Sequence, residues 1–398
     1  MNQDIAQDLH HLLPDDGYAG TLVGRAWVPG APAGPSVVAI RAEGIFDLSA
    51  AFATMTDLLE HEDAAARVQA TPGQRVASVE EALRNTGRAR REPALVHLLA
   101  PCDLQVVKAA GVTFATSLLE RVIEEQAGGD KSRADAVRAE VQALIGARLA
   151  DVKPGSQAAA TLKALLQQRG LWSQYLEVGI GPDAEVFTKA PVLSSVGTGV
   201  AVGIRSDSAW NNPEPEVVLA VNSRGQVLGA ALGNDVNLRD IEGRSALLLG
   251  KSKDNNASCA IGPFIRLFDA TFTLDDVRRE TLDLKVTGPE GYVLDGMSSM
   301  AEISRDPLEL VRQTLATHQY PDGFVLFLGT LFAPIEDRDE PGGGFTHKLG
   351  DLVSIRSSRL GGLLNRVGIS EQLPPWEFGV RALMNNLAQR GLLARSQG

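Results

Sequence analysis

The chain has 398 residues, of which 44% are hydrophobic and 22% charged, values close to the average of globular domains. This composition excludes a disordered chain, a coiled coil and a collagen-like repeat, and the length predicts two or three domains. The 38 Lys and Arg against 49 Asp and Glu leave a net charge of −11, which disfavours partners such as nucleic acid or anionic lipid.

The two cysteines, Cys102 and Cys259, are too few for a disulfide scaffold or a cysteine-based zinc site. No apolar run approaches the roughly 18 residues that cross a bilayer. The first 16 residues carry four aspartates where a signal peptide would carry Lys or Arg. We therefore expect a cytoplasmic protein that binds no membrane.

A small α+β domain is predicted over residues 1–105. Residues 21–49 contain two apolar runs separated by a Gly/Pro/Ala break, which indicates strands joined by a loop. Helices are expected near 51–61 and 79–85, and residues 94–100 form another short apolar segment.

Helical periodicity dominates the next part of the chain. Residues 111–126 show an amphipathic pattern that Gly128 and Gly129 end. Two Ala/Leu/Arg-rich stretches, 132–150 and 156–168, follow on either side of Lys153-Pro154-Gly155. They predict a helical insertion at about 130–170 within a second domain of residues 106–398.

After Trp172 the sequence changes to short Val-rich runs broken by Gly, Pro and Asn, typical of strands. Residues 222–225 (NSRG) lie between two such runs and predict a hairpin. Residues 376–393 are expected to form a terminal helix. The predicted fold class is therefore α+β.

Glu214-Pro215-Glu216 opens the strand-like run 217–221. Because strand side chains alternate, both carboxylates should project from one face, about 6.7 Å apart. At an effective dielectric of about 20 they would repel by about 2.5 kcal/mol, a cost that a bound cation offsets. A pair of surface acids is the alternative.

Asp235 lies 19 residues beyond Glu216, just past the returning strand of the predicted hairpin, and can come back beside both glutamates. Three hard oxygen ligands favour Mg²⁺ or Mn²⁺. The sequence thus predicts a metal site made of Glu214, Glu216 and Asp235.

Lys251 in a glycine-preceded turn and Lys189 before Ala190-Pro191 are each either a solvated charge or a charge aimed into a site. Residues 243–252 lack the glycine and the strand-helix context of a phosphate loop. Asp337, Asp339 and Asp351 with His347 lack EF-hand spacing, and a solvated acidic loop is the favoured interpretation.

A set of short motifs resembles, in order, those of the fumarylacetoacetate hydrolase superfamily over residues 105–370. The motifs are Phe187-Thr188-Lys189, SSVGTG at 194–199, Glu214-Pro215-Glu216, Asn234-Asp235-Val236, Arg239-Asp240, Gly250-Lys251-Ser252, Gly262-Pro263, Leu328-Gly329-Thr330 and Gly350-Asp351. The resemblance implies a mixed β-roll catalytic domain, homodimers or homotetramers, and a divalent metal held by the three predicted acids. It also implies a 2-keto acid or 1,3-dicarbonyl substrate.

The same resemblance assigns roles to further residues. Lys251 and Thr330 match positions that contact substrate, and Lys189 and Arg239 match positions near the site. C–C hydrolases of the superfamily carry a segment G-x-N-Y-x-x-H-x-x-E whose His and Glu activate water. Here Ser117 stands at the histidine position and Glu120 at the glutamate position, so the usual general base is missing.

With this departure, the long N-terminal domain, the helical insertion and the stretch from 294–296 through 345–347, the chain resembles the dehydratase branch that acts on 2-keto-3-deoxypentonates. A metal on the carboxylate and keto oxygens would make the C3 proton removable. Glu120 or Lys251 is the candidate base, and loss of the C4 hydroxyl followed by tautomerisation would yield 2,5-dioxopentanoate. The alternative for Glu120 is a salt-bridged helix surface residue beside Arg121 and Glu124.

Two other functions stay open from the sequence. One is a C–C bond hydrolase or decarboxylase of acylpyruvates or oxaloacetate, against which Ser117 argues. The other is a non-catalytic sugar-acid binding protein that keeps the fold.

Overall fold

The computed structural model describes residues 5, 9–141, 152–168, 172–332, 334, 336–339 and 344–393. Its strands are β1 Leu22–Val28, β2 Gly34–Arg41, β3 Gly44–Asp47, β4 Gln74–Ala77, β5 His97–Leu99, β6 Val106–Gly111, β7 Glu185–Ala190, β8 Ala201–Ile204, β9 Asn211–Asn212, β10 Pro215–Val221, β11 Val227–Asp235, β12 Asn237–Leu238, β13 Cys259–Leu267, β14 Thr281–Thr287, β15 Val293–Ser299, β16 Phe324–Phe327, β17 Leu352–Ser357 and β18 Gly361–Ile369. Its α-helices are α1 Leu9–Leu12, α2 Met55–Leu59, α3 Ala64–Ala70, α4 Val79–Thr86, α5 Ala115–Ala127, α6 Ala134–Val141, α8 Gln157–Gln168, α9 Gln174–Ile180, α10 Arg239–Glu242, α11 Leu249–Lys253, α12 Leu274–Val277, α13 Pro307–Leu315 and α14 Val380–Gln389.

One large sheet connects the N-terminal strands with the later ones, in the order β4-β3-β2-β1-β13-β11-β10-β16-β6-β7, and β5 pairs with β1. The junction is the antiparallel pair β1 and β13, where Leu22 lies opposite Arg266. The sheet therefore continues across residue 105, and the domain boundary at that residue stays a prediction.

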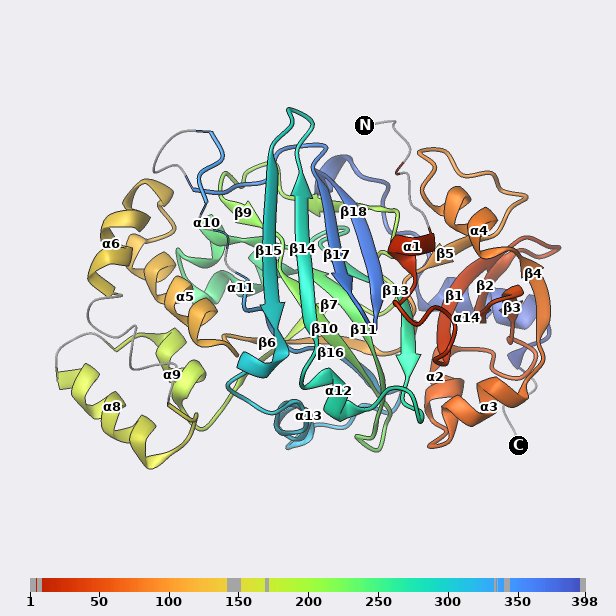
Figure 1. Ribbon diagram of the computed structural model, residues 1–398, viewed down its shortest axis with the longest axis horizontal. Helices are drawn as coiled ribbons and strands as arrows, with labels where there is room; N and C mark the ends of the chain where they lie inside the picture. The colour runs from red at the N-terminus through yellow and green to blue at the C-terminus, as the bar shows by residue number, and fades with distance from the viewer. Residues whose placement is uncertain are drawn as a thin grey trace.

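A second sheet, β15-β14-β17-β18-β8, lies in front of β10, β11 and β16 in Figure 1. Along β14 the burial alternates, with Leu282 and Leu284 buried and Asp283 and Lys285 exposed, so one face of this sheet covers a core. The main apolar core joins such residues to Leu232 and others on the large sheet. Mixed helices and sheets confirm the α+β fold class.

The helices α5, α8 and α9 form a separate apolar cluster at the left of Figure 1, which includes Leu118, Leu162 and Leu176. The predicted helix 111–126 is confirmed as α5, although it starts later because Gly111 ends β6. Gly128 ends it with a φ of 66°, a left-handed conformation that glycine adopts without strain.

The predicted helical insertion is only partly within the described residues. Its second stretch is confirmed as α8. Of the first stretch, 132–150, a 3₁₀ turn and α6 are seen up to Val141, and residues 142–150 lie outside the described residues.

Other predicted elements differ at their ends. The helix expected at 51–61 is the shorter α2, which begins at Met55 because Thr54 caps it. The Thr54 hydroxyl accepts from the Asp57 amide, and the Asp57 carboxylate accepts from the Thr54 amide.

The predicted hairpin is confirmed by β10 and β11, with Gly225 at a φ of 78°. None of the helices in the described ranges is both long and apolar enough to cross a bilayer.

Candidate metal centre and active site

Three buried carboxylates meet at the open end of the β10–β11 hairpin. Glu216 lies on β10, Glu214 directly precedes it, and Asp235 ends β11. The register places Pro215 opposite Asn234, and the Asp235 amide donates to the Glu214 carbonyl at 3.0 Å. One carboxylate oxygen of each acid lies within 4.8 Å of the others. The structure thus brings the predicted metal ligands together.

Two lysines form ion pairs with two of these acids. Lys253 Nζ donates to Glu214 Oε2 at 2.6 Å and to Asp235 Oδ2 at 3.1 Å, and Lys189 Nζ lies 2.7 Å from Asp235 Oδ1. Burial raises the pKa of Asp235, but the charges of Lys189 and Lys253 outweigh it and lower the pKa below its ordinary value. Asp235 is therefore held as a carboxylate.

Glu216 is in a different electrostatic position. Its Oε2 accepts from the Gly329 amide at 2.6 Å, and no ion pair of Glu216 occurs among the described residues. Burial, together with the charges of Asp235 and Glu214, raises its pKa well above the ordinary range. Among the described residues, Glu216 is thus the one of the three acids that no cation pairs with directly.

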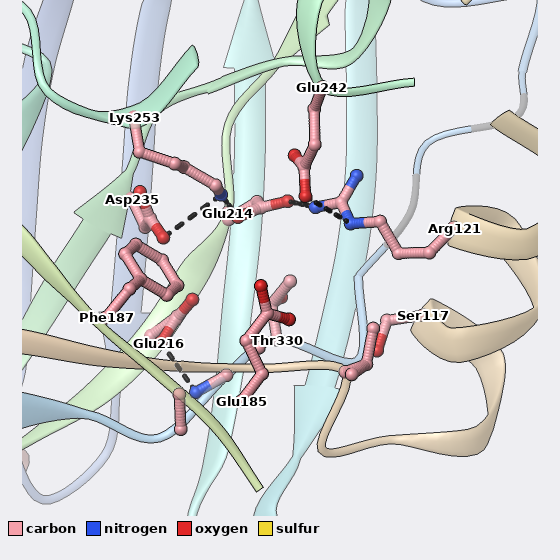
Figure 2. A pocket seen from close by; sticks show the side chains of 14 residues that line it. Ser117, Arg121, Glu185, Phe187, Glu214, Glu216, Asp235, Glu242, Lys253 and Thr330 are labelled. Atoms are coloured by element: carbon pink, nitrogen blue, oxygen red, sulfur yellow. Dashed lines mark hydrogen bonds and ion pairs between the residues drawn. The ribbon is translucent and has the colours of Figure 1, made fainter. Parts of the chain in front are cut away.

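A pocket opens onto these acids (Figure 2). Among the described residues it is lined by Ala110, Gly111, Val112, Ser117, Arg121, Glu185, Phe187, Glu214, Glu216, Asp235, Glu242, Lys253, Gly329 and Thr330. This lining has five carboxylates against two cationic groups and contains no histidine. Clustered hard oxygens with uncompensated negative charge fit a divalent cation such as Mg²⁺ or Mn²⁺.

The lysine of this pocket is Lys253, and the prediction of Lys251 is wrong. Both lie on α11, but Lys251 is exposed whereas the Lys253 side chain is 4% exposed. Because successive helical residues are about 100° apart, positions two residues apart point to nearly opposite sides. Burial lowers the pKa of Lys253, but Asp235 and Glu214 outweigh it and raise the pKa above its ordinary value.

Glu120 and Arg239 also lie outside the pocket lining. The Glu120 carboxylate is bound by Arg138 at 2.8 Å and by Arg239 at 3.0 Å. Arg239 also donates to Glu124 at 2.6 Å and lies over the Trp210 ring. Glu120 is thus salt-bridged, as in the alternative interpretation, but it is buried and not on the surface.

The remaining predicted residues are placed as follows. Ser117 lines the pocket and its hydroxyl donates to the Phe114 carbonyl at 3.0 Å. Thr330 lines it too, and its hydroxyl accepts from the Phe332 amide at 3.0 Å. Lys189 is fully buried behind Asp235 and does not line the pocket.

Three charged residues of the pocket were missed. Arg121, on α5, pairs with Glu214 and lies 3.4 Å from Glu242, on α10. Burial raises the pKa of Glu242 to about 7, although Arg121 opposes the shift. These two come from helices distant in sequence, and no local pattern marks them.

Glu185 is the third missed residue, and strand alternation could have found it. On β7, Glu185, Phe187 and Lys189 occupy alternate positions and therefore share a face. Burial raises the pKa of Glu185, and no ion pair of this residue occurs among the described residues. Its carboxyl group is thus available for proton transfer.

The acidic loop interpretation is wrong for two residues. His347 and Asp351 are buried, and Asp351 is bound by both terminal nitrogens of Arg338 at 2.7 Å. Asp337 and Asp339 are exposed, as expected. The cluster is therefore a buried ion pair rather than a solvated loop.

Comparisons with known proteins point in one direction. No family profile matches the chain. It is 32% identical over 186 residues to 2-dehydro-3-deoxy-D-arabinonate dehydratase of Saccharolobus solfataricus, covering 46% of this chain and 58% of the relative. It is 29% identical over 201 residues to a probable 2-keto-3-deoxyxylonate dehydratase of Haloferax volcanii, covering 50% and 66%. The matches thus span about three fifths to two thirds of the length of these relatives.

Solved structures share the fold over more of the chain. The apo form of 2-keto-3-deoxy-D-arabinonate dehydratase has a TM-score of 0.61 at 23% identity and covers 88% of this chain and 99% of its own. A form complexed with magnesium and 2,5-dioxopentanoate has a TM-score of 0.59 at 22% identity, with the same coverage. The predicted resemblance to 2-keto-3-deoxypentonate dehydratases is thereby confirmed, in sequence over about half of the chain and in fold over most of it.

Proposed function

We propose that this protein is a metal-dependent hydro-lyase that converts a 2-keto-3-deoxypentonate to 2,5-dioxopentanoate. The observation that carries the proposal is the pocket in which Glu214, Glu216 and Asp235 converge beside Lys253, with no histidine among the described lining residues. The sequence relatives are named as dehydratases of this substrate class, which supports the same reaction.

The three acids would hold Mg²⁺ or Mn²⁺, whose chemistry when bound is to draw electron density from a 2-keto acid and so acidify its C3 proton. The charge of the site favours this role, because Glu216 carries a buried carboxyl that its own neighbours do not neutralise. A named relative in fold is complexed with magnesium and 2,5-dioxopentanoate, which supports the choice of metal.

Three residues of the pocket have different roles in this reaction. Glu185 lines the pocket without an ion-pair partner among the described residues, so its carboxylate accepts the C3 proton. The Lys253 ammonium donates hydrogen bonds beside the acids and is placed to orient the oxygens of the substrate. Thr330 offers a hydroxyl in the same lining.

The elimination then balances without a co-reactant. The C3–H bond breaks as its proton goes to Glu185, the C4–O bond breaks, and the hydroxyl leaves as water with the proton that Glu185 returns. Two tautomerisation steps convert the resulting unsaturated 5-hydroxy acid to 2,5-dioxopentanoate. Water is the single co-product, which matches a pocket that needs no hydrolytic base.

The test is turnover of purified protein on 2-keto-3-deoxy-D-arabinonate and on 2-keto-3-deoxyxylonate, with Mg²⁺ or with a chelator. The product is measured by its oxidation with a semialdehyde dehydrogenase. We expect turnover with Mg²⁺, its loss with chelator, and a loss of about 10²- to 10⁴-fold in Glu185→Gln with Mg²⁺ binding retained. No turnover of either acid by Mg²⁺-loaded, folded protein would overturn the dehydratase proposal.

The hydrolase alternative is weakened by the pocket. A C–C hydrolase of this superfamily uses an imidazole to activate water, and Ser117 takes that place here with its hydroxyl bonded to a main-chain carbonyl. Release of pyruvate from an acylpyruvate, without dehydration of the sugar acids, would establish the hydrolase function instead. Binding of the sugar acids without any turnover would indicate the non-catalytic binding protein.

The cytoplasmic location, the homodimer or homotetramer, and the small 2-keto acid as partner stay predictions. Light scattering of the purified protein would measure its oligomeric state directly.

A further inference from the structure

A second cavity, which shares no lining residue with the pocket at the three acids, is formed by N-terminal strands, residues 193–200 and the segment that leads into α14. Its volume is about 200 Å³, and among the described residues it is lined by Arg25, Trp27, Pro35, Arg91, Leu98, Leu99, Ala100, Leu193, Ser195, Val196, Gly197, Val200 and Phe378. In Figure 1 the elements β1, β5 and α14 lie to the right, and β10 and β11, which carry two of the three acids, lie near the centre.

The charge of this cavity is opposite to that of the whole protein. Its lining contains two arginines and no acidic side chain, although the chain carries a net charge of −11. Arg25 is satisfied within the protein, because Nη1 donates to the Cys102 carbonyl at 2.7 Å and Nε lies 3.6 Å from Asp103 Oδ2. The charge left over therefore belongs to Arg91.

Arg91 is a largely buried cation without a counterion in the part of the chain that the structure describes. Within the described residues, its Nε donates to the Thr86 carbonyl at 3.4 Å. Burial lowers the pKa of Arg91, and burial together with the charge of Arg91 lowers the pKa of His97 to about 3. His97 is therefore neutral, and the guanidinium of Arg91 is the charge that an occupant would meet.

The rest of the lining is flat and apolar. The rings of Trp27 and Phe378 meet edge to face, with centroids 5.5 Å apart and an interplanar angle of 85°. Trp27 also stacks on His97 at 6.4 Å. The lining also includes Leu193, a non-glycine residue at a φ of 67°, a conformation that costs about 1 kcal/mol or more and often marks a ligand site.

We propose that this cavity binds a small carboxylate that carries a planar apolar group. The carboxylate would form a paired, charge-assisted contact with the guanidinium of Arg91, the geometry in which arginine binds carboxylates best. The apolar group would pack against Trp27 and Phe378, since aromatic walls with a few convergent polar groups are typical of small-molecule sites.

The test uses benzoate as the probe, with benzamide as its neutral match in shape and inorganic phosphate as an anion without an apolar group. Binding to the full chain in Mg²⁺ buffer is measured by titration calorimetry and by Trp fluorescence. We expect benzoate to bind at least about tenfold more tightly than either benzamide or phosphate, because a charge-assisted bond is worth about that factor. The same binding must persist in Glu216→Gln, which places it outside the metal centre.

Variants of neighbouring arginines provide the matched control. Arg91→Gln should remove the preference for benzoate over benzamide, whereas Arg90→Gln, at an exposed neighbour, should change benzoate binding less than twofold. Trp27→Phe should weaken the binding of benzoate and of benzamide by a similar factor. Thermal unfolding of each variant shows whether it is folded. If a variant is not folded, the comparison of benzoate, benzamide and phosphate on the unaltered protein still tests the proposal.

Equal affinity for benzoate and benzamide, unchanged benzoate binding in folded Arg91→Gln, or no benzoate binding at 10 mM, on the order of the weakest affinities that such contacts give, would each overturn the proposal. Phosphate binding as tight as benzoate would overturn the apolar part of it. None of these results depends on the dehydratase activity.

Discussion

Two buried ionic clusters of this protein differ in how their charges balance. In the cluster around Asp351, each carboxylate oxygen accepts from Arg338 at 2.7 Å, and Oδ2 also accepts from the Lys348 amide at 2.9 Å. Burial raises the pKa of Asp351, but the hydrogen bonds from Arg338 outweigh it and bring the pKa to about 2. This cluster is complete within the chain.

At the metal centre, by contrast, the charged groups of the chain do not all pair with one another. Its described lining holds five carboxylates against Arg121 and Lys253, and the pKa of Glu216 is raised by burial and by neighbouring carboxylates. A buried charge without compensation costs several kcal/mol. The comparison teaches that a balanced cluster stabilises the fold, whereas an excess of one sign marks a place for a ligand of the opposite sign.

The largest expected effect comes from removing the Glu216 carboxylate, which has no ion-pair partner among the described residues. Glu216→Gln should lower Mg²⁺-dependent turnover by about 10⁴-fold or more, because the metal loses a ligand. In chelator the same variant should have a higher melting temperature than the unaltered protein, because a repelled buried carboxylate is gone. Turnover assays and thermal unfolding with and without Mg²⁺ test both statements, and a lower melting temperature in chelator would contradict the comparison.

The two lysines of α11 provide a matched pair. Lys253→Met should lower turnover by about 10³-fold, whereas Lys251→Met should leave it within twofold, because Lys251 is exposed. Since Lys253→Met removes one of the cations that pair with Glu214 and Asp235, Lys253→Arg and a melting curve serve as controls for folding. Equal losses in the two methionine variants would contradict the assignment of Lys253.

In the cluster around Asp351, Asp351→Asn should lower the stability of the protein and leave its Mg²⁺ affinity unchanged. It leaves the Arg338 guanidinium without its main partner, and we expect about 3 kcal/mol less free energy of unfolding. Because the pKa of Asp351 is lowered in the folded state, its contribution is present above the unfolded pKa of about 4 and is lost as the pH falls towards 2. Denaturant unfolding at pH 7 and pH 3 measures it, and a variant as stable as the unaltered protein would refute it.

The smallest effect is expected at Ser117. Its hydroxyl already donates to the Phe114 carbonyl, so Ser117→Ala should change turnover by no more than about threefold. Steady-state kinetics on the sugar acid is the measurement. A loss of 100-fold or more would instead assign Ser117 a direct part in proton transfer.

The sequence alone determined which three acids meet at the proposed metal site, because their proximity is a local property of one hairpin. Strand alternation places Glu214 and Glu216 on one face, and the turn at 222–225 returns Asp235 beside them. The same local logic holds for α5, where Gly128 ends the helix. Strand alternation along β7 also contained the signal for Glu185, which was not used.

The tertiary structure alone decided which side chains join those ligands. Lys251 and Lys253 are equally good lysines in sequence, and only the packing of α11 against β7 and β12 turns Lys253 inward. Arg121 reaches Glu214 across 93 residues of sequence, and Arg138 and Arg239 hold Glu120 away from the pocket. The physical reason is that pairing within a hairpin follows from the backbone itself, whereas the partner of a buried charge depends on how separate elements pack.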